Sequence, residues 1–279
     1  MRQVTPHGPV VGLVGVLTLL AVLGRATGLG PAGWIVGLAS GVALCALLTA
    51  GLVRASRRRL LPADRVTLSR AVLVCGVAAL VADIVAATVA GPVARTVAGT
   101  VAGTGDTDEP TGVLVALASV ALVLDAVDGR VARRTRTVHP LGARFDMETD
   151  AFLILVLSVA VTRDLGWWVL GVGVARYLLL LVALAARWAP WLRGQVPARL
   201  WRKVIAAYQG IVLTVAAAGI LPAVAASAAV AAGLGLLVLS FGTEVLTLRR
   251  MSVSRRHEVE VLAPLSVVGA TAVDAHVLP

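Results

Sequence analysis

Residues 66–90 read VTLSRAVLVCGVAALVADIVAATVA, a run of 25 residues with only two charged side chains, Arg70 and Asp83. A helix needs about 20 mostly apolar residues to cross the hydrocarbon core of a bilayer. The other runs of this kind cover residues 9–24, 34–53, 111–127, 151–161, 167–186, 204–221 and 223–246. The sequence therefore predicts an all-α, polytopic membrane protein with about eight transmembrane helices.

The composition excludes other classes of protein. Hydrophobic residues make up 58% of the chain and charged residues only 14%, whereas a soluble domain carries about 25% charged residues. Aromatic residues, at 4%, are too scarce for the two aromatic girdles of a lipid-facing barrel. Cys45 and Cys75 lie in apolar runs without a CxxC motif or a nearby histidine, so neither a disulfide framework nor a zinc site is indicated.

The basic residues predict the orientation of the chain. With the N-terminus in the cytoplasm, all 25 Lys and Arg residues except Arg25, Arg95, Arg163 and Arg176 fall in or beside cytoplasmic segments. This asymmetry predicts a protein of the cell membrane with both termini in the cytoplasm. The basic segment 54–59 is expected to contact anionic membrane lipids, and nucleic acid is not expected as a partner.

Four aspartates are patterned at the ends of two consecutive predicted helices. Asp128 is three positions after Asp125, and Gly142, Asp146 and Asp150 follow at steps of four. Residues at these spacings share one face of a helix. The fifth apolar run reaches spanning length only when residues 145–149 are added to it, which brings Asp146 and Asp150 into the helix. Two antiparallel helices would then each present two carboxylates at the cytoplasmic side.

Four facing carboxylates need a positive partner, because a charge at a membrane helix centre costs about 2.5 to 3.5 kcal/mol. Hard divalent cations prefer oxygen ligands and keep positions open for phosphate oxygens. The missing or small side chains of Gly129, Ala132 and Gly142 leave room for a ligand, and the guanidinium of Arg133 suits a phosphate. The alternative is that the aspartates simply pair with the Arg-rich loop.

The two segments together resemble the signature of the CDP-alcohol phosphotransferases. They read Asp125-Ala-Val-Asp128-Gly-Arg-Val-Ala-Arg133 and, after eight residues, Gly142-Ala-Arg-Phe-Asp-Met-Glu-Thr-Asp150. The resemblance implies a six-helix core within residues 61–248. Residues 1–60 would add two transmembrane helices and a basic linker, and residues 249–279 would form a cytoplasmic tail of little structure.

A second segment supports the resemblance. Residues 62–70 are similar to the family's entry into its first core helix, although Asp64 stands where asparagine is usual. The resemblance implies that Thr67 and Arg70 contact the CDP moiety or its phosphates, together with Gly129, Ala132, Arg133 and Gly142.

Residues near the predicted seventh span concern the acceptor. Lys203 and Gln209 resemble a Lys and Gln pair of the family, but Ala206 stands where threonine is common. A phosphorylated acceptor could be held by basic side chains of the preceding loop. The candidates are Arg193, Arg199, Arg202 and Lys203; their alternative role is to fix topology and contact anionic lipids.

The resemblance implies a transferase of phospholipid synthesis. The four aspartates would hold two Mg²⁺ or Mn²⁺ ions against the pyrophosphate of CDP-diacylglycerol or another CDP-alcohol. Asp150 would take the proton of the acceptor hydroxyl, the oxygen would attack the phosphorus distal to cytidine, and CMP would leave. The resemblance also implies a homodimer.

Two other functions remain open from the sequence. Carboxylates in membranes also mark cation- or proton-coupled transporters, and an inactive homologue could serve as a scaffold. The identity of the hydroxyl acceptor is open too. Asp83 and Arg176 are both expected near mid-membrane, where they could pair or make separate polar contacts.

Overall fold

The computed structural model describes residues 7–54, 62–102, 109–135, 140–185, 200–243, 246–247 and 249. Every labelled element of this part of the chain is helical, which confirms the predicted all-α class. The helices are α1 (His7–Thr27), α2 (Pro31–Arg54), α3 (Pro62–Ala102), α4 (Glu109–Thr135), α5 (Pro140–Leu165), the 3₁₀ turn η1 (Trp167–Val169), α6 (Leu170–Ala185), α7 (Leu200–Ala217) and a C-terminal helix (Ala223–Thr243).

Proline and glycine delimit these helices. Pro31, Pro62 and Pro140 are the first residues of α2, α3 and α5, a position where the missing N–H of proline carries no penalty. Gly28, with φ 66°, lies between α1 and α2. Gly91 has φ 78° inside α3 and kinks that helix, because this backbone conformation breaks the helical hydrogen-bond pattern and is readily adopted only by glycine.

The chain is a multi-pass membrane protein. Five described helical segments are long and apolar enough to cross a bilayer: Gly8–Thr27, Pro31–Val53, Asp64–Gly91, Pro110–Val127 and Ala223–Thr243. Two shorter apolar helices cover Trp167–Val182 and Val204–Ala217. Helix α5 is not among them, because its first half carries Arg144, Asp146, Glu148 and Asp150. The predicted fifth span therefore exists as a helix, and its first half is polar because it carries these four charged side chains.

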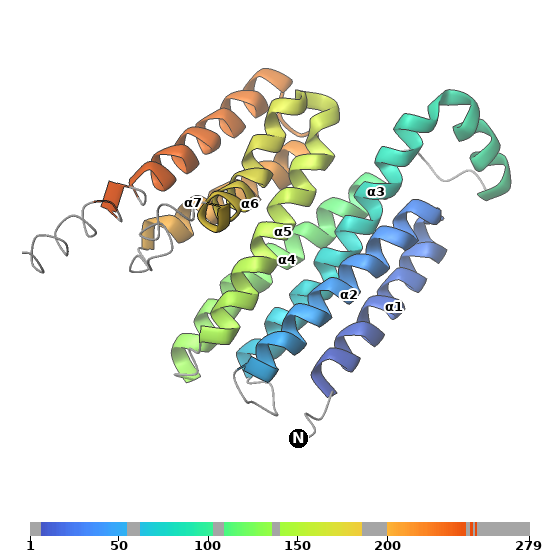
Figure 1. Ribbon diagram of the computed structural model, residues 1–279. Coiled ribbons are helices and arrows are strands. Elements are labelled where there is room, and N and C mark those ends of the chain that lie inside the picture. Colours follow the sequence, from blue (N-terminus) through green and yellow to red (C-terminus); the bar gives the residue numbers. More distant parts are fainter. Residues whose placement is uncertain are drawn as a thin grey trace, which may run out of the picture.

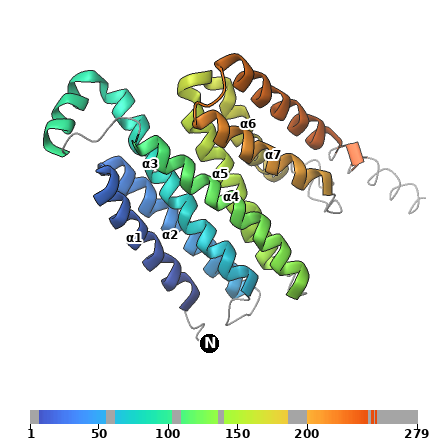
Figure 2. The same cartoon turned by 180° about the vertical axis from the view of Figure 1, so that it is seen from behind.

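Helix α3 lies at the centre of the molecule. It packs against α1, α2, α4 and α5, and α5 in turn packs against α6 and α7. Figures 1 and 2 show the long helices side by side, with α1 and α2 at one edge and α6, α7 and the C-terminal helix at the other. The buried face of α3 includes Val74, Val77 and Leu80, so α3 supplies much of the core.

The two N-terminal helices pack tightly on the core. A Cβ atom added at Gly33 of α2 would lie 2.9 Å from the carbonyl oxygen of Ala79 in α3. One added at Gly12 of α1 would lie 2.8 Å from Cδ1 of Leu68. Such small residues let membrane helices approach closely and gain van der Waals contact. Helices α1 and α2 are therefore continuous with the core rather than loosely attached to it.

Of the two alternatives for Asp83 and Arg176, the structure shows separate polar contacts and not a pair. Asp83 Oδ2 accepts a hydrogen bond from the backbone N–H of Gly30 at 2.9 Å, in the turn before α2. Arg176 of α6 instead pairs with Glu148 of α5, with 2.6 Å between Nη2 and Oε1. Helix periodicity could not give these partners, because they depend on how α3 and α6 are placed among the other helices.

Candidate active site

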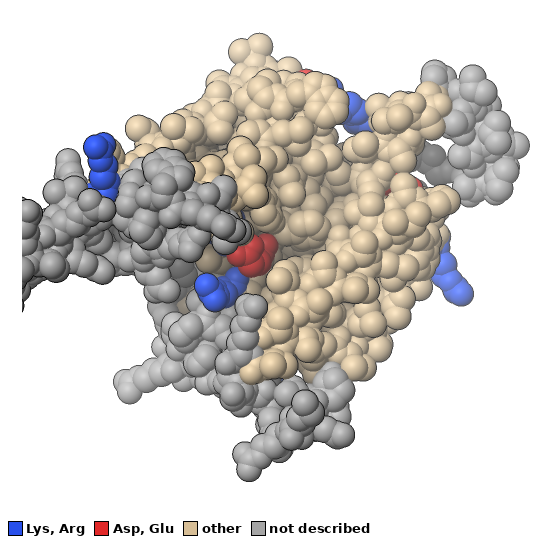
Figure 3. Space-filling model, viewed as in Figure 1, with Lys and Arg blue, Asp and Glu red and all other residues tan. Residues whose placement is uncertain are grey.

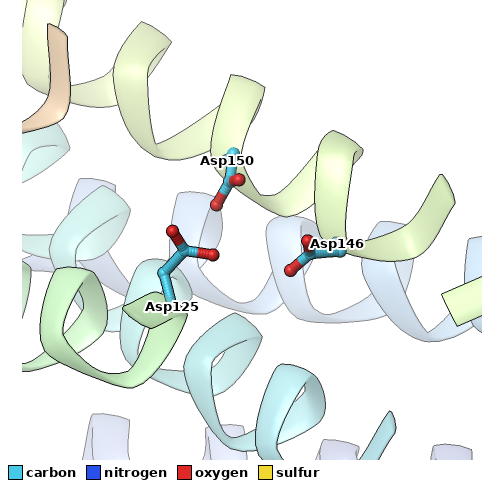
Figure 4. Close-up of side chains that lie close together, drawn as sticks. All are labelled: Asp125, Asp146 and Asp150. Carbon is cyan, nitrogen blue, oxygen red and sulfur yellow. The ribbon is translucent and has the colours of Figure 1, made fainter. Parts of the chain in front are cut away.

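Three of the four predicted metal ligands converge in the structure. Asp125 comes from α4, and Asp146 and Asp150 come from consecutive turns of α5 (Figure 4). Each offers a carboxylate oxygen, and these oxygens all lie within 4.8 Å of one another. The step of four residues places both α5 carboxylates on one face, and that face points toward α4. We call these three side chains the acidic cluster.

Arg70 of α3 lies against the acidic cluster. Its side chain is fully buried and forms ion pairs with Asp125, Asp146 and Asp150, the last at 3.1 Å between Nη2 and Oδ1. Nη2 also donates to the backbone carbonyl of Asp146 at 3.3 Å. These three ion pairs share one guanidinium, so they alone do not neutralise the three carboxylates.

Two predicted nucleotide contacts lie beside this centre. Thr67, one turn before Arg70, is buried. Gly142 lies in the first turn of α5 next to the start of α3, where an added Cβ would lie 2.6 Å from Oδ1 of Asp64. The missing side chain of Gly142 thus leaves space for the buried Asp64, a neighbour that the sequence did not identify.

Other predicted residues are only partly described. Gly129 lies on α4 one turn after Asp125. The backbones of Asp128, Ala132 and Arg133 continue α4, and those of Arg202 and Lys203 lie in the first turn of α7, but the side chains of all five lie outside the description. Arg193 and Arg199 fall entirely outside the described residues.

A cleft opens beside the acidic cluster. Besides the three aspartates, its lining comes from α4, α5 and α7 and is apolar: Leu122, Leu153, Ile154, Ala206, Ala207 and Gly210. Figure 3 shows acidic side chains gathered in a hollow of the molecular surface. Sequence reasoning singled out only Ala206 among these apolar residues, although Leu153 and Ile154 follow Asp150 by about one turn and could have been placed near its face.

The donor set fits a hard divalent cation. Carboxylate oxygens are the ligands that Mg²⁺ and Mn²⁺ prefer, and the acidic cluster supplies one from each of three residues. The cluster also lies where the apolar window Pro110–Val127 of α4 ends and the polar half of α5 begins. A charged, water-soluble group can therefore meet an apolar cleft at this point of the protein.

One of three comparisons with known proteins gives a match, and it covers the part of the chain that forms the site. Neither the curated proteins nor the solved structures give a significant match to the chain. The family model described as CDP-alcohol phosphatidyltransferase matches residues 60–241, a stretch that contains α3 to α7, the acidic cluster, Arg70 and the cleft. With most of its length matched by this model, the chain belongs to the CDP-alcohol phosphatidyltransferase family.

Proposed function

We propose that this protein transfers a phosphatidyl group from CDP-diacylglycerol, or a related group from another CDP-alcohol, to a hydroxyl acceptor. The observation that carries the proposal is the acidic cluster, in which Asp125, Asp146 and Asp150 bring their oxygens within 4.8 Å beside an apolar cleft. The product would be a phospholipid or its precursor. Family membership supports the reaction class, and the cleft suits a substrate with an apolar chain.

Each part of the site has a task in this reaction. Asp125, Asp146 and Asp150, with Asp128 as the fourth ligand, would hold two Mg²⁺ or Mn²⁺ ions. When bound, these ions would neutralise the pyrophosphate and the leaving CMP. Arg70 and Arg133 would bind phosphate oxygens, since a guanidinium forms bidentate hydrogen bonds with them.

The transfer step needs no covalent intermediate. Asp150 would accept the proton of the acceptor hydroxyl. The acceptor oxygen would form a bond to the phosphorus distal to cytidine, while the bond from that phosphorus to the CMP oxygen breaks and CMP leaves with the electron pair. Four basic residues, Arg193, Arg199, Arg202 and Lys203, are the proposed contacts of a phosphorylated acceptor.

The position of the acidic cluster favours an enzyme over a transporter. Transporters bind their coupling ions near the bilayer midplane, whereas Asp146 lies six residues after the first residue of α5. The distribution of Lys and Arg supports placement of this end of α5 at the cytoplasmic face of the cell membrane, where CDP-alcohols would enter. A homodimer is proposed on the resemblance alone.

A direct assay tests the proposal. Purified protein in detergent with CDP-diacylglycerol, Mg²⁺ and a panel of hydroxyl acceptors should release CMP. Asp150→Asn should lower the rate by about 10²- to 10⁴-fold, the contribution typical of a general base. The matched control is Asp164→Asn, because Asp164 is an exposed aspartate near the other end of α5.

Failure of the assay has a defined form. If Asp150→Asn turns over at the wild-type rate, the proposed site is wrong. If the activity survives exhaustive chelation with EDTA, the two-metal mechanism is wrong even though the transfer stands. If no CDP-alcohol yields CMP with any acceptor, the proposed transferase activity is wrong, and a scaffold or transporter function is favoured instead.

A further inference from the structure

The ion pair between Glu148 and Arg176 has no part in the reaction described above. Glu148 lies on α5 between Asp146 and Asp150, and Arg176 lies on α6. The 2.6 Å distance joins Arg176 Nη2 to Glu148 Oε1. Each side chain is 32% exposed, so the pair is half-buried in the contact between the two helices.

Helix geometry places this pair directly behind the acidic cluster. Each residue advances about 100° around an α-helix. Glu148 is therefore about 160° around the helix from both Asp146 and Asp150, which puts it on the opposite face of α5. Asp146 and Asp150 thus lie on the face of α5 that points toward α4, and Glu148 lies on the opposite face.

A second contact fixes the same face of α5 against α6. A Cβ atom added at Gly173 would lie 2.6 Å from Cα of Leu155. Leu155 is seven residues after Glu148, so these two residues share one face of α5. Gly173 is three residues before Arg176, so these two share one face of α6. The close approach fixes the distance between α5 and α6, and the ion pair fixes how α5 is rotated against α6.

The surroundings of Arg176 make its pairing energetically important. It lies in the apolar helix Trp167–Val182, and Leu178, Leu180 and Leu181 near it on α6 are exposed as lipid-facing side chains are. A charge in such a place is expensive unless an opposite charge neutralises it. Glu148 is the partner that the structure gives it.

We propose that the Glu148–Arg176 ion pair is a positioning contact that holds α5 in the rotation at which Asp146 and Asp150 face Asp125. The proposal rests on the proposed function, because it assigns the pair a role in assembling that metal site. Neither residue touches the substrate in this role. Without the pair, α5 can rotate about its own axis. Such a rotation separates the ligands contributed by α4 from the two ligands contributed by α5.

Charge reversal and its repair test the proposal. Glu148→Arg and Arg176→Glu each put two like charges in contact, and the double variant restores an opposite pair in reversed order. Each single variant should weaken Mn²⁺ binding, measured by electron paramagnetic resonance titration of the purified protein, by roughly tenfold. Its rate of CMP release should fall by roughly ten- to a hundredfold, as expected when reacting groups are displaced. The double variant should recover to within about threefold of wild type.

A second ion pair on the same helix gives the matched control. Arg163 and Asp164 lie near the end of α5, and their side chains are 52% and 53% exposed. The distance from Arg163 Nε to Asp164 Oδ1 is 3.5 Å. Arg163→Glu and Asp164→Arg should leave Mn²⁺ affinity and turnover unchanged. The proposal is overturned if the Glu148 and Arg176 single variants bind Mn²⁺ like wild type, or if the double variant is as impaired as the single ones.

Neutral variants keep the test decisive where charge reversal prevents folding. Glu148→Gln, Arg176→Gln and the double variant form a double-mutant cycle. Positioning by the pair predicts that the double variant binds Mn²⁺ no more weakly than the worse single variant; losses that multiply overturn it. Wild-type protein that binds Mn²⁺ but releases no CMP refutes the proposed function alone. Wild-type turnover without repair by the swap refutes the positioning role alone.

Discussion

Arg70 carries the charge balance of the acidic cluster at the scale of a single residue. It is fully buried and reaches the carboxylates of Asp125, Asp146 and Asp150. A buried charge whose partner is removed costs several kcal/mol, because the remaining charges stay desolvated. We therefore expect the acidic cluster to depend on Arg70 for its assembly, in addition to the phosphate contact proposed for Arg70.

Substitution of Arg70 should separate its charge from its shape. Arg70→Gln removes the positive charge from among three carboxylates, and we expect CMP release to fall by at least about a hundredfold and the unfolding temperature in EDTA to drop by about 5 °C. Arg70→Lys keeps the charge but loses the planar fork, so its stability should lie closer to wild type than its activity does. Turnover and thermal unfolding in detergent measure the two effects.

Arg65→Gln is the control for these variants. Arg65 lies on the same helix but is exposed, so its substitution should change neither stability nor turnover. An Arg70→Gln protein that unfolds and turns over like wild type would show that the three ion pairs have no energetic role.

At the scale of the helices, the close approach of α2 to α3 depends on a glycine. Gly33 of α2 faces the backbone of α3, where the carbonyl oxygen of Ala79 would lie 2.9 Å from an added Cβ. Backbone cannot move aside as a flexible side chain can, so a larger residue has to push α2 and α3 apart. Helix α3 also carries Thr67 and Arg70, which makes this contact relevant to the site.

Gly33→Leu should therefore destabilise the protein. Overpacking of a tight contact costs about 1 to 3 kcal/mol, which corresponds to a drop of roughly 5 °C in unfolding temperature for a chain of this size. Gly235→Leu is the matched control, because an added Cβ at Gly235 meets nothing within 4 Å. Thermal unfolding of both variants in the same detergent checks the prediction, and equal stability would contradict the proposed close packing.

Features within one helix could be predicted from the sequence, whereas contacts between helices could not. The steps between Asp146 and Asp150 lie within one helix, so local periodicity was enough to place both carboxylates on one face. Contacts between helices are different, because they depend on the rotation and depth of each helix. Asp83 with Gly30, Arg176 with Glu148, and Arg70 with the acidic cluster all join helices, and none of these pairs was predicted. Glu148 was overlooked because nothing in its local spacing distinguishes it.

At the scale of the whole molecule, the two N-terminal helices and the matched core form one packed unit. Helix α3 contacts both α1 and α2, although the family model begins only at residue 60. Asp83 of α3 links the two parts through its hydrogen bond from Gly30, at the turn between α1 and α2. A carboxylate at this place also interacts favourably with the positive end of the α2 dipole.

Asp83→Ala should weaken this link and lower the stability of the molecule as one unit. Loss of a capping carboxylate costs about 1 kcal/mol and up to about 2 kcal/mol, so the unfolding temperature should fall by a few degrees in a single transition. Asp83→Asn keeps an oxygen acceptor and should lose less, while Asp164→Ala, at an exposed aspartate, should lose nothing. Thermal unfolding, followed together with the release of an N-terminal fragment by limited proteolysis, measures the effect. If α1 and α2 instead unfold separately from the core in the wild-type protein, these two helices form an independent unit and their contacts with α3 do not stabilise the site.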